Sequence, residues 1–447
     1  MKPITLREVA SACGGTLHGD PEIQITSIVT DSRKATAGSL FAAIKGERVN
    51  GHRFIPMTVE QGAVCALCED APKIDVPYIQ VESTLIALKG IAEYYRSLFS
   101  IPFIGVTGSV GKTSTKELIS SVLSQKYNVH KTAGNFNNEL GVPLTLFGLE
   151  ESHEVAVIEM GISGFGEMTR LSKMVRPDIS VITNIGYCHL ENLGDRDGVL
   201  KAKTEMFSYL KENGRIILCH DDDKLCTVAD YRGVKPIFYG TDPNDEYYAD
   251  NIEELLLDGV RCTLHHSDSA IEVTIPAMGR HNVLNALCAM AVGKQLGLTD
   301  EQIKNGIEHF QNVGSRNNII RTRGMIVIDD CYNANPTSTK AGLNTLSNFE
   351  GRKVALLGDM KELGTDELKL HKEVGAYAKE KGIDLLIAVG ELSKATAEGF
   401  GENAVYFDTV EDCIARITDL LKEGDAVLIK ASHSMHFEKI VDALKEE

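Results

Sequence analysis

One segment, residues 101–117, restricts the fold of this chain more than any other. Its sequence, IPFIGVTGSVGKTSTKE, runs from an apolar stretch through a turn with two glycines to a lysine and a polar stretch. The apolar stretch predicts a buried strand, and the residues after Lys112 predict the start of a helix. A strand, a glycine-containing turn and a helix in this order are typical of an α/β domain with a mostly parallel sheet.

The turn also has the composition of a phosphate-binding loop (P-loop). Gly108 and Gly111 allow backbone N–H groups to turn toward a phosphate, and the helix N-terminus adds positive potential. Lys112 is placed to reach the β- and γ-phosphates, and the Thr113 hydroxyl is placed to bind Mg²⁺. The predicted ATP or GTP site comprises Gly108, Ser109, Val110, Gly111, Lys112, Thr113 and Ser114.

Position 106 departs from the general pattern of this loop. The pattern G-x-x-x-x-G-K-[ST] requires glycine there, whereas this chain has Val106. The alternative interpretation is an ordinary strand, turn and helix with a chance Gly-Lys-Thr. We favour the P-loop because the strand, glycines, lysine, threonine and helix occur together in the required order.

Composition and charge narrow the function classes. The chain has 447 residues, too many for one hydrophobic core, and we expect two to four domains. Its hydrophobic content of 43% and charged content of 24% are typical of soluble globular enzymes. A net charge of −17 argues against nucleic acid or an anionic membrane as the main partner, although a local basic pocket can still bind a nucleotide.

The N-terminus and the cysteines indicate the compartment. The N-terminus carries charge early and no long apolar stretch follows it, so we expect neither a signal peptide nor a membrane span. The ten cysteines are scattered, which favours a reducing cytoplasm. Only Cys65 and Cys68 have C-x-x-C spacing, and without a second pair we interpret them as buried small side chains rather than zinc ligands.

The order of expected strands and helices indicates an α/β chain of three domains. Residues 1–98 predict a small α/β domain, and residues 99–312 predict a central domain with the P-loop in a mostly parallel sheet. Alternating patterns between residues 237 and 275 predict antiparallel strands appended to that sheet. Residues 313–447 return to strand–helix alternation and predict a separate Rossmann-like domain.

Two expected strands of the central domain end in polar residues. Glu159 ends one strand, and because the carboxyl ends of parallel strands line the ligand crevice, it is placed to bind Mg²⁺. His189 follows the next strand and is a candidate for metal or phosphate, although a lone histidine there is more often an ordinary loop residue. Periodicity alone makes Lys201 and Lys203 solvated residues of an amphipathic helix.

Two later segments carry groups suited to a nucleotide. Asn282 and Asn285 lie one turn apart on an expected helix, where their amides suit an adenine edge or, alternatively, an N-cap and a surface position. Asp330 and Asn333 follow a strand and fit ribose and base contacts, unless the segment is only a turn that uses Asn and Pro. Arg316, just upstream, suits a bidentate phosphate contact.

Taken in order, these motifs resemble the Mur ligase family, the ATP-dependent amide-forming enzymes of peptidoglycan precursor synthesis. Within the family the resemblance is to the MurF type. The family P-loop also lacks the first glycine, which accounts for Val106. The segments that fit the MurF type are residues 132–145, 183–191 and 329–336. Residues 30–33 and 45–47 are similar to the UDP-binding domain of the MurE and MurF types.

The resemblance implies three domains: a UDP-substrate domain, a central ATPase domain and a Rossmann-like C-terminal domain, in a monomeric cytoplasmic enzyme. The implied small-molecule substrates are UDP-MurNAc-tripeptide and D-Ala-D-Ala, with ATP and two Mg²⁺ ions as cofactors. The residues implied for the UDP-sugar substrate are Ser32, Arg33, Lys45, Gly46, Thr132, Asn135, Asn137 and Asn138. Those implied around the nucleotide, besides the P-loop, are Asn282, Asn285, Arg316, Asp330 and Asn333.

The resemblance also implies the chemistry. The γ-phosphate of ATP passes to the terminal carboxylate of the tripeptide, and the amine of D-Ala-D-Ala attacks the acyl-phosphate. In the family one lysine near residues 201–203 is carbamylated and supports a second metal, and Lys203 aligns with it better than Lys201. The other residues implied for catalysis or metal binding are Lys112, Thr113, Glu159 and His189.

The C-terminal domain contains a departure from the family pattern. Where the family often has Lys-Gly-Ser-Arg, this chain has Lys-Ala-Ser-His at residues 430–433. An anion contact from this loop is therefore in doubt at neutral pH, where histidine is mostly uncharged. Residues 358–364 and His371 belong, by resemblance, to the active-site face of this domain.

Three other functional assignments compete with the MurF type. The MurE type has a similar first domain, and folylpolyglutamate synthase shares the central motifs. This chain has no Asp-Asn-Pro-Arg segment of the MurE kind, and residues 332–336, Tyr-Asn-Ala-Asn-Pro, favour the MurF type. The alternative from another class is a P-loop NTPase that hydrolyses nucleotide to switch conformation. The sequence does not distinguish meso-diaminopimelate from L-lysine at the third position of the peptide.

Overall fold

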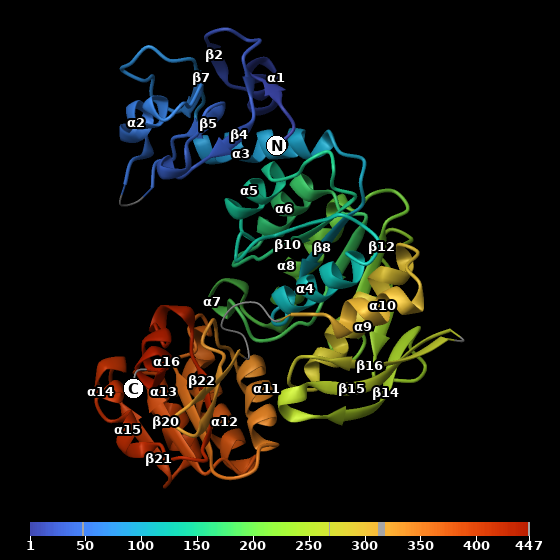
Figure 1. The fold of residues 1–447 in the computed structure, drawn as a ribbon, viewed down its shortest axis with the longest axis vertical. Helices are drawn as coiled ribbons and strands as arrows, with labels where there is room; N and C mark the ends of the chain where they lie inside the picture. The colour runs from blue at the N-terminus through green and yellow to red at the C-terminus, as the bar shows by residue number, and fades with distance from the viewer. Residues whose placement is uncertain (47–48, 268, 312–317, 446–447) are drawn as a thin grey trace.

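In the computed structural model, the three large β-sheets of the described residues lie one after another along an arc (Figure 1). The structure describes residues 1–46, 49–267, 269–311 and 318–445. The N-terminal sheet and the C-terminal sheet occupy the two ends of the arc, and the sheet that carries the P-loop lies between them (Figure 1). This arrangement confirms the expected fold class, whereas the expected domain boundaries remain predictions.

The N-terminal sheet has five strands with parallel pairing except at one edge. Their order is β2 (Thr16–His18), β7 (Tyr78–Gln80), β6 (Cys65–Cys68), β5 (Ser39–Ala42) and β4 (Ser27–Val29). A short pair, β1 (Ile4–Thr5) and β3 (Gln24–Ile25), lies beside it. The helices are α1 (Leu6–Cys13), α2 (Ile55–Glu60) and α3 (Thr84–Ser97). Cys65 and Cys68 are buried in different apolar clusters, as expected for structural cysteines.

The central sheet has nine strands, and the P-loop strand β8 lies deep inside it. The order is β16 (Ser269–Ile275), β15 (Val260–His266), β14 (Tyr247–Glu254), β13 (Ile237–Gly240), β12 (Arg215–Cys219), β11 (Ile179–Ile182), β8 (Phe103–Thr107), β10 (Val155–Glu159) and β9 (Val129–Lys131). The helices are α4 (Lys112–Leu123), α5 (Gly141–Phe147), α6 (Glu167–Val175), α7 (Leu190–Leu193), α8 (Arg196–Thr204), α9 (His281–Gln295) and α10 (Asp300–Glu308).

One detail of the central sheet differs from the expectation. Strand β13 pairs with β12 in parallel, and β14 pairs with β13 in parallel, so the antiparallel part comprises only β14, β15 and β16. Residue alternation shows which face of a strand is buried, but it carries no information about the direction of the neighbouring strand. The parallel part of the sheet therefore extends further than the pattern indicated.

The C-terminal sheet has six strands covered by helices. The order is β17 (Asn318–Thr322), β18 (Met325–Asp329), β22 (Ala426–Lys430), β19 (Lys353–Gly358), β20 (Leu385–Val389) and β21 (Ala404–Phe407), all parallel except β17. The helices are α11 (Pro336–Ser347), α12 (Glu367–Glu380), α13 (Ser393–Phe400), α14 (Val410–Ile414), α15 (Ile417–Leu420) and α16 (Glu438–Lys445). Among the described residues, no helix has both the length and the apolar character to cross a membrane.

Arg96 near the end of α3 ties the N-terminal part to the central sheet. Its guanidinium is buried and donates to the carbonyls of Val175, Phe99 and Arg176 at 2.6, 3.0 and 3.2 Å. It also lies 3.6 Å from the ring centroid of Phe103, in strand β8. Burial lowers the pKa of Arg96 to about 10, which shows the cost of enclosing this cation.

We expect Arg96→Ala to lower the melting temperature of the central part by about 6–12 °C, because it leaves three carbonyls without their donor, a loss of about 3 kcal/mol in a unit of about 200 residues. Differential scanning calorimetry measures the change. Arg176→Ala is the control, because Arg176 is half-exposed in a surface pair with Glu93 that contributes less than about 1 kcal/mol. Equal, small effects of both substitutions would contradict the anchoring role of Arg96.

Candidate active site

A cavity of about 560 Å³ lies between the carboxyl edge of the central sheet and the C-terminal part. Its walls come from the P-loop, from the ends of β10, β11 and β12, from the start of α9, and from residues 330–342 with Lys430. The strand ends of two sheets thus converge on one space. This is the position at which open parallel sheets bind ligands.

The P-loop takes a conformation that requires its two glycines. Gly108 has φ +150°, and a Cβ there would lie 1.9 Å from the hydroxyl oxygen of Thr183. Gly111 has φ +81° and precedes the first residue of α4, where another side chain would strain the backbone. The loop therefore presents its backbone to the cavity at the N-terminus of a helix, as a phosphate site requires.

Lys112 and Thr113 follow directly in the first turn of α4. The Nζ of Lys112 donates to the carbonyls of Gly108 and Ser109 at 2.8 and 3.4 Å, so the ammonium lies folded over the loop. The Thr113 hydroxyl donates to Oε2 of Glu159 at 2.9 Å. P-loop, hydroxyl and strand-end carboxylate are therefore brought together as the sequence predicted.

Glu159 is buried at the end of β10 and has a partner on each oxygen. Besides Thr113 on Oε2, the amide of Asn137 donates to Oε1 at 2.8 Å, and the ammonium of Lys116 lies 3.7 Å from Oε2. Its backbone N–H donates to the Thr132 hydroxyl at 2.9 Å. A hydroxyl and a carboxylate are hard oxygen donors that suit Mg²⁺. Among the described residues no group of three or more His, Cys, Asp or Glu side chains could hold a metal ion by itself.

His189 lines the cavity and contacts the C-terminal part. It has φ +52°, directly before α7, and its Nδ1 lies 2.6 Å from Oε2 of Glu362. The N–H of Leu190 donates to the Glu362 carbonyl at 3.0 Å. The contact with His189 lowers the pKa of Glu362. His189 thus connects the wall of the cavity to the C-terminal part.

Burial separates the two candidate lysines of α8. Lys203 is 1% exposed, whereas Lys201 is exposed with its Nζ 5.6 Å from the ring centroid of Phe165. Burial, followed by the charge of Lys112, lowers the pKa of Lys203 to about 8, although Cys188 opposes the shift. The solvated-helix interpretation is therefore wrong for Lys203 and right for Lys201. Lys203 lies four residues after the buried Val199 and next to the buried Ala202, so it occupies the inner face of α8, where a lysine is seldom enclosed.

The two asparagines of α9 differ in their access to the cavity. Asn285 lines it, accepts from the Thr115 hydroxyl at 2.8 Å, and donates to the side chain of Asn282 at 2.9 Å. Asn282 in turn donates to the Met278 carbonyl at 2.8 Å and is buried. Asn282 thus holds Asn285, and only Asn285 is among the residues that line the cavity.

The C-terminal part contributes Asp330 and Asn333 to the cavity. Lys430, only 3% exposed, donates to Oδ2 of Asp330 at 2.5 Å and to the Asn333 carbonyl at 2.9 Å. Arg316 lies outside the described residues. His371 is fully buried, with its ring nitrogens on the Met360 N–H and the Glu367 carbonyl, so it braces residues 358–364 rather than facing a ligand.

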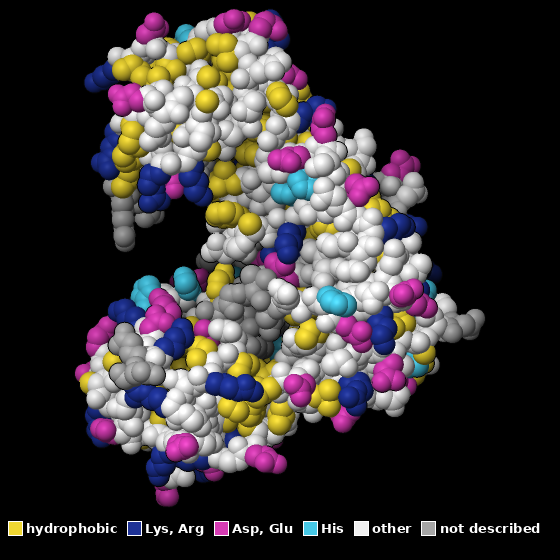
Figure 2. Space-filling model, viewed as in Figure 1, with side chains coloured by type: hydrophobic (Ala, Val, Ile, Leu, Met, Phe, Trp, Pro, Cys, Tyr) yellow, Lys and Arg dark blue, Asp and Glu magenta, His cyan; other side chains and the backbone are white. Residues whose placement is uncertain are grey.

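The residues implied for the UDP-sugar substrate are spread over two parts of the molecule. Arg33 is exposed and paired with Asp31, and Lys45 is half-exposed between Glu69 and Asp70; Ser32 and Gly46 adjoin them in the N-terminal part. Of the residues from the central part, Asn137 and Asn138 line the cavity, Thr132 is buried behind Glu159, and Asn135 is exposed. A wide hollow separates the N-terminal part from the C-terminal part, with Lys and Arg side chains along its upper rim (Figure 2).

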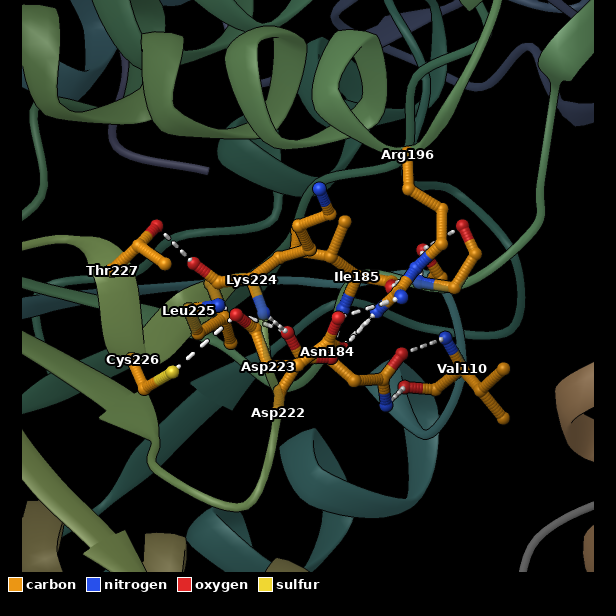
Figure 3. A network of polar contacts seen from close by, with 12 residues as sticks. Val110, Asn184, Ile185, Arg196, Asp222, Asp223, Lys224, Leu225, Cys226 and Thr227 are labelled. Atoms are coloured by element: carbon orange, nitrogen blue, oxygen red, sulfur yellow. Dashed lines mark hydrogen bonds and ion pairs between the residues drawn. The ribbon is translucent and has the colours of Figure 1, made fainter.

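Two residues that hold the P-loop were absent from the predicted site. Asn184 accepts from the Val110 N–H and donates to the Val110 carbonyl, both at 2.9 Å. Asp222 accepts from the Ile185 N–H at 2.7 Å, so the ends of β11 and β12 are connected (Figure 3). Polar residues directly after two neighbouring parallel strands were the available signal for both.

The fold and the cavity together define a P-loop nucleotide-binding enzyme. A separate domain, which is Rossmann-like, faces the P-loop across the cavity. Three family models match the chain: Mur ligase family, catalytic domain, over residues 24–98; Mur ligase middle domain, over residues 106–293; and Mur ligase, glutamate ligase domain, over residues 315–433.

Relatives match over nearly the full length. UDP-N-acetylmuramoyl-tripeptide–D-alanyl-D-alanine ligase of Bacillus subtilis (strain 168) is 37% identical, over 99% of this chain and 98% of its own. MurF from Acinetobacter baumannii is 33% identical, covers 100% of both chains and has a TM-score of 0.94. MurF ligase from Thermotoga maritima in complex with ADP is 28% identical, covers 94% and 97%, and has a TM-score of 0.84. This chain belongs to the Mur ligase family.

We expect Asn184→Ala to weaken ADP binding about tenfold, a loss of about 1.4 kcal/mol in binding, because the Val110 N–H loses its acceptor and the Val110 carbonyl keeps only the Thr183 hydroxyl as a side-chain donor. Isothermal titration calorimetry measures the affinity. Asn192→Ala, at an exposed position of α7, is the control and should bind ADP normally. Unchanged affinity in Asn184→Ala would show that the loop keeps its conformation without this side chain.

Proposed function

We propose that this chain is an ATP-dependent ligase that joins D-alanyl-D-alanine to UDP-MurNAc-tripeptide, giving UDP-MurNAc-pentapeptide, ADP and phosphate. The observation that carries the proposal is the full-length similarity to relatives named for this ligation, with the P-loop and Glu159 site intact. The ADP complex of the Thermotoga relative supports an adenine nucleotide in the cavity. We also propose three domains, at residues 1–98, 99–312 and 313–447, in a monomeric cytoplasmic enzyme.

The chemistry explains why such a site needs concentrated positive charge. A carboxylate is a poor acyl donor, so one of its oxygens first attacks the γ-phosphorus and releases ADP. The amine of the dipeptide then attacks the acyl carbon, loses a proton, and expels phosphate that carries the former carboxyl oxygen. The first step brings two anions together, and preorganised cations lower its barrier.

The residues of the cavity divide this work. The P-loop N–H groups and Lys112 would bind the β- and γ-phosphates, and Asn285, Asp330 and Asn333 would surround the nucleoside. Two Mg²⁺ ions would supply further positive charge, one beside Thr113 and Glu159 and one beside Glu159, His189 and a carbamate on Lys203. Burial lowers the pKa of Lys203 and so favours the uncharged amine, which is the form that reacts with CO₂.

The test is phosphate release by the purified protein with ATP, Mg²⁺ and UDP-MurNAc-tripeptide, with and without D-Ala-D-Ala. We expect release that depends on the dipeptide, together with the pentapeptide product by mass spectrometry. Release without dipeptide dependence would indicate an NTPase switch. Turnover of UDP-MurNAc-dipeptide with a free diamino acid, but not of the tripeptide, would indicate the MurE type.

We expect Lys203→Ala to reduce ligation at least about 10³-fold, because the carbamate would support a cation at the reacting phosphate. Small carboxylic acids such as acetate should restore part of the activity by entering the vacated space. Lys201→Ala is the matched control on the same helix and should retain activity, since its side chain is exposed. Full activity in Lys203→Ala would refute a carbamate at this position.

A further inference from the structure

A row of alternating charges runs from the surface to the strand-end carboxylate Glu159. Lys131, whose side chain is 44% exposed, contacts one oxygen of Glu117 at 2.5 Å, and Lys116 contacts the other at 2.9 Å. Lys116 then lies 3.7 Å from Oε2 of Glu159, the oxygen that also accepts from Thr113. The mechanism above gives no role to Lys116.

Lys116 is the most enclosed cation in this row. Its side chain is 0% exposed, and its Nζ donates to the Thr132 carbonyl at 2.7 Å in addition to its two carboxylate contacts. Enclosing an ammonium costs several kcal/mol unless acceptors surround it, so its position is set by these three contacts. Lys116 is absent from the lining of the cavity, whereas Lys112 of the same helix is part of it.

Lys116 contacts both the Glu159 carboxylate and Thr132, the residue that binds the Glu159 backbone. The ammonium holds the Thr132 carbonyl, while the Thr132 hydroxyl accepts from the Glu159 backbone N–H at 2.9 Å. It also attracts the Glu159 carboxylate directly. A single side chain of α4 therefore orients both the main chain and the carboxylate of the residue at the end of β10.

We propose that Lys116 is a positioning residue that holds Glu159 in the orientation for binding Mg²⁺ with the nucleotide. This proposal takes one assumption from the proposed function, namely that Glu159 binds Mg²⁺. The Lys116 ammonium does not reach the cavity, because its side chain is enclosed between α4 and the residues at the ends of β9 and β10. Its effect on the nucleotide should therefore be seen only when Mg²⁺ is present.

The test compares Lys116→Met with Lys131→Met. Lys131 is the other lysine of the row and lies on the outer side of Glu117. ADP affinity is measured by isothermal titration calorimetry with Mg²⁺ and again with EDTA. In Lys116→Met we expect the increase in ADP affinity caused by Mg²⁺ to fall at least tenfold, while the affinity in EDTA stays within twofold of the unmodified protein. Lys131→Met should match the unmodified protein in both conditions.

Three results would overturn the proposal. If Lys116→Met weakens ADP binding equally in Mg²⁺ and in EDTA, Lys116 has a general structural role. If Mg²⁺ raises the ADP affinity of Lys116→Met as much as that of the unmodified protein, Lys116 has no role in positioning Glu159. If Lys116→Met binds ADP with Mg²⁺ more tightly than the unmodified protein does, the ammonium opposes the metal. If Lys116→Met does not fold, Lys116→Gln keeps a donor for Thr132 without the charge and should show the same selective loss. The experiment uses neither UDP-MurNAc-tripeptide nor D-Ala-D-Ala. Its result therefore does not depend on whether the protein catalyses the proposed ligation.

Discussion

The buried carboxylate of Glu159 is the contact on which the arrangement of this site depends. An enclosed carboxylate is stable only if hydrogen-bond donors and a cation surround it. Thr113, Asn137 and Lys116 supply these groups from α4 and from the segment after β9. One buried charge thus fixes the P-loop helix, the strand β10 and the segment after β9 relative to one another.

The two outer parts of the molecule are attached to this centre in different ways. The N-terminal part is joined through α3, whose Arg96 is buried under carbonyls of the central part and packs on Phe103. The C-terminal part meets the centre across the cavity, with a polar contact between Glu362 and His189. Its own contribution to the cavity is fixed internally, because Lys430 binds both Asp330 and the Asn333 carbonyl. Local cations such as Lys112 explain how a chain of net charge −17 can offer a site for polyanions.

The sequence allowed the P-loop, the strand-end position of Glu159 and the three-sheet architecture to be predicted, because these follow from local patterns. It could not distinguish Lys203 from a solvated lysine, since burial there depends on how the end of α8 packs. The direction of β13 and the burial of Asn282 away from the cavity also depend on tertiary neighbours. Asn184 follows a predicted strand within a segment that the sequence singled out, but its bond to the P-loop could be seen only in the fold. Lys116 was missed because it acts through Glu159 and Thr132, and such a role leaves no motif.

The central claim is that the γ-phosphate passes to a substrate carboxylate and not to water. It can be tested with UDP-MurNAc-tripeptide labelled with ¹⁸O in its terminal carboxylate, incubated with ATP, Mg²⁺ and D-Ala-D-Ala, with the released phosphate analysed by mass spectrometry. The account predicts one ¹⁸O atom in each phosphate, because the oxygen that attacked the γ-phosphorus leaves with it. Phosphate free of the label would show that water is the acceptor and would contradict the account.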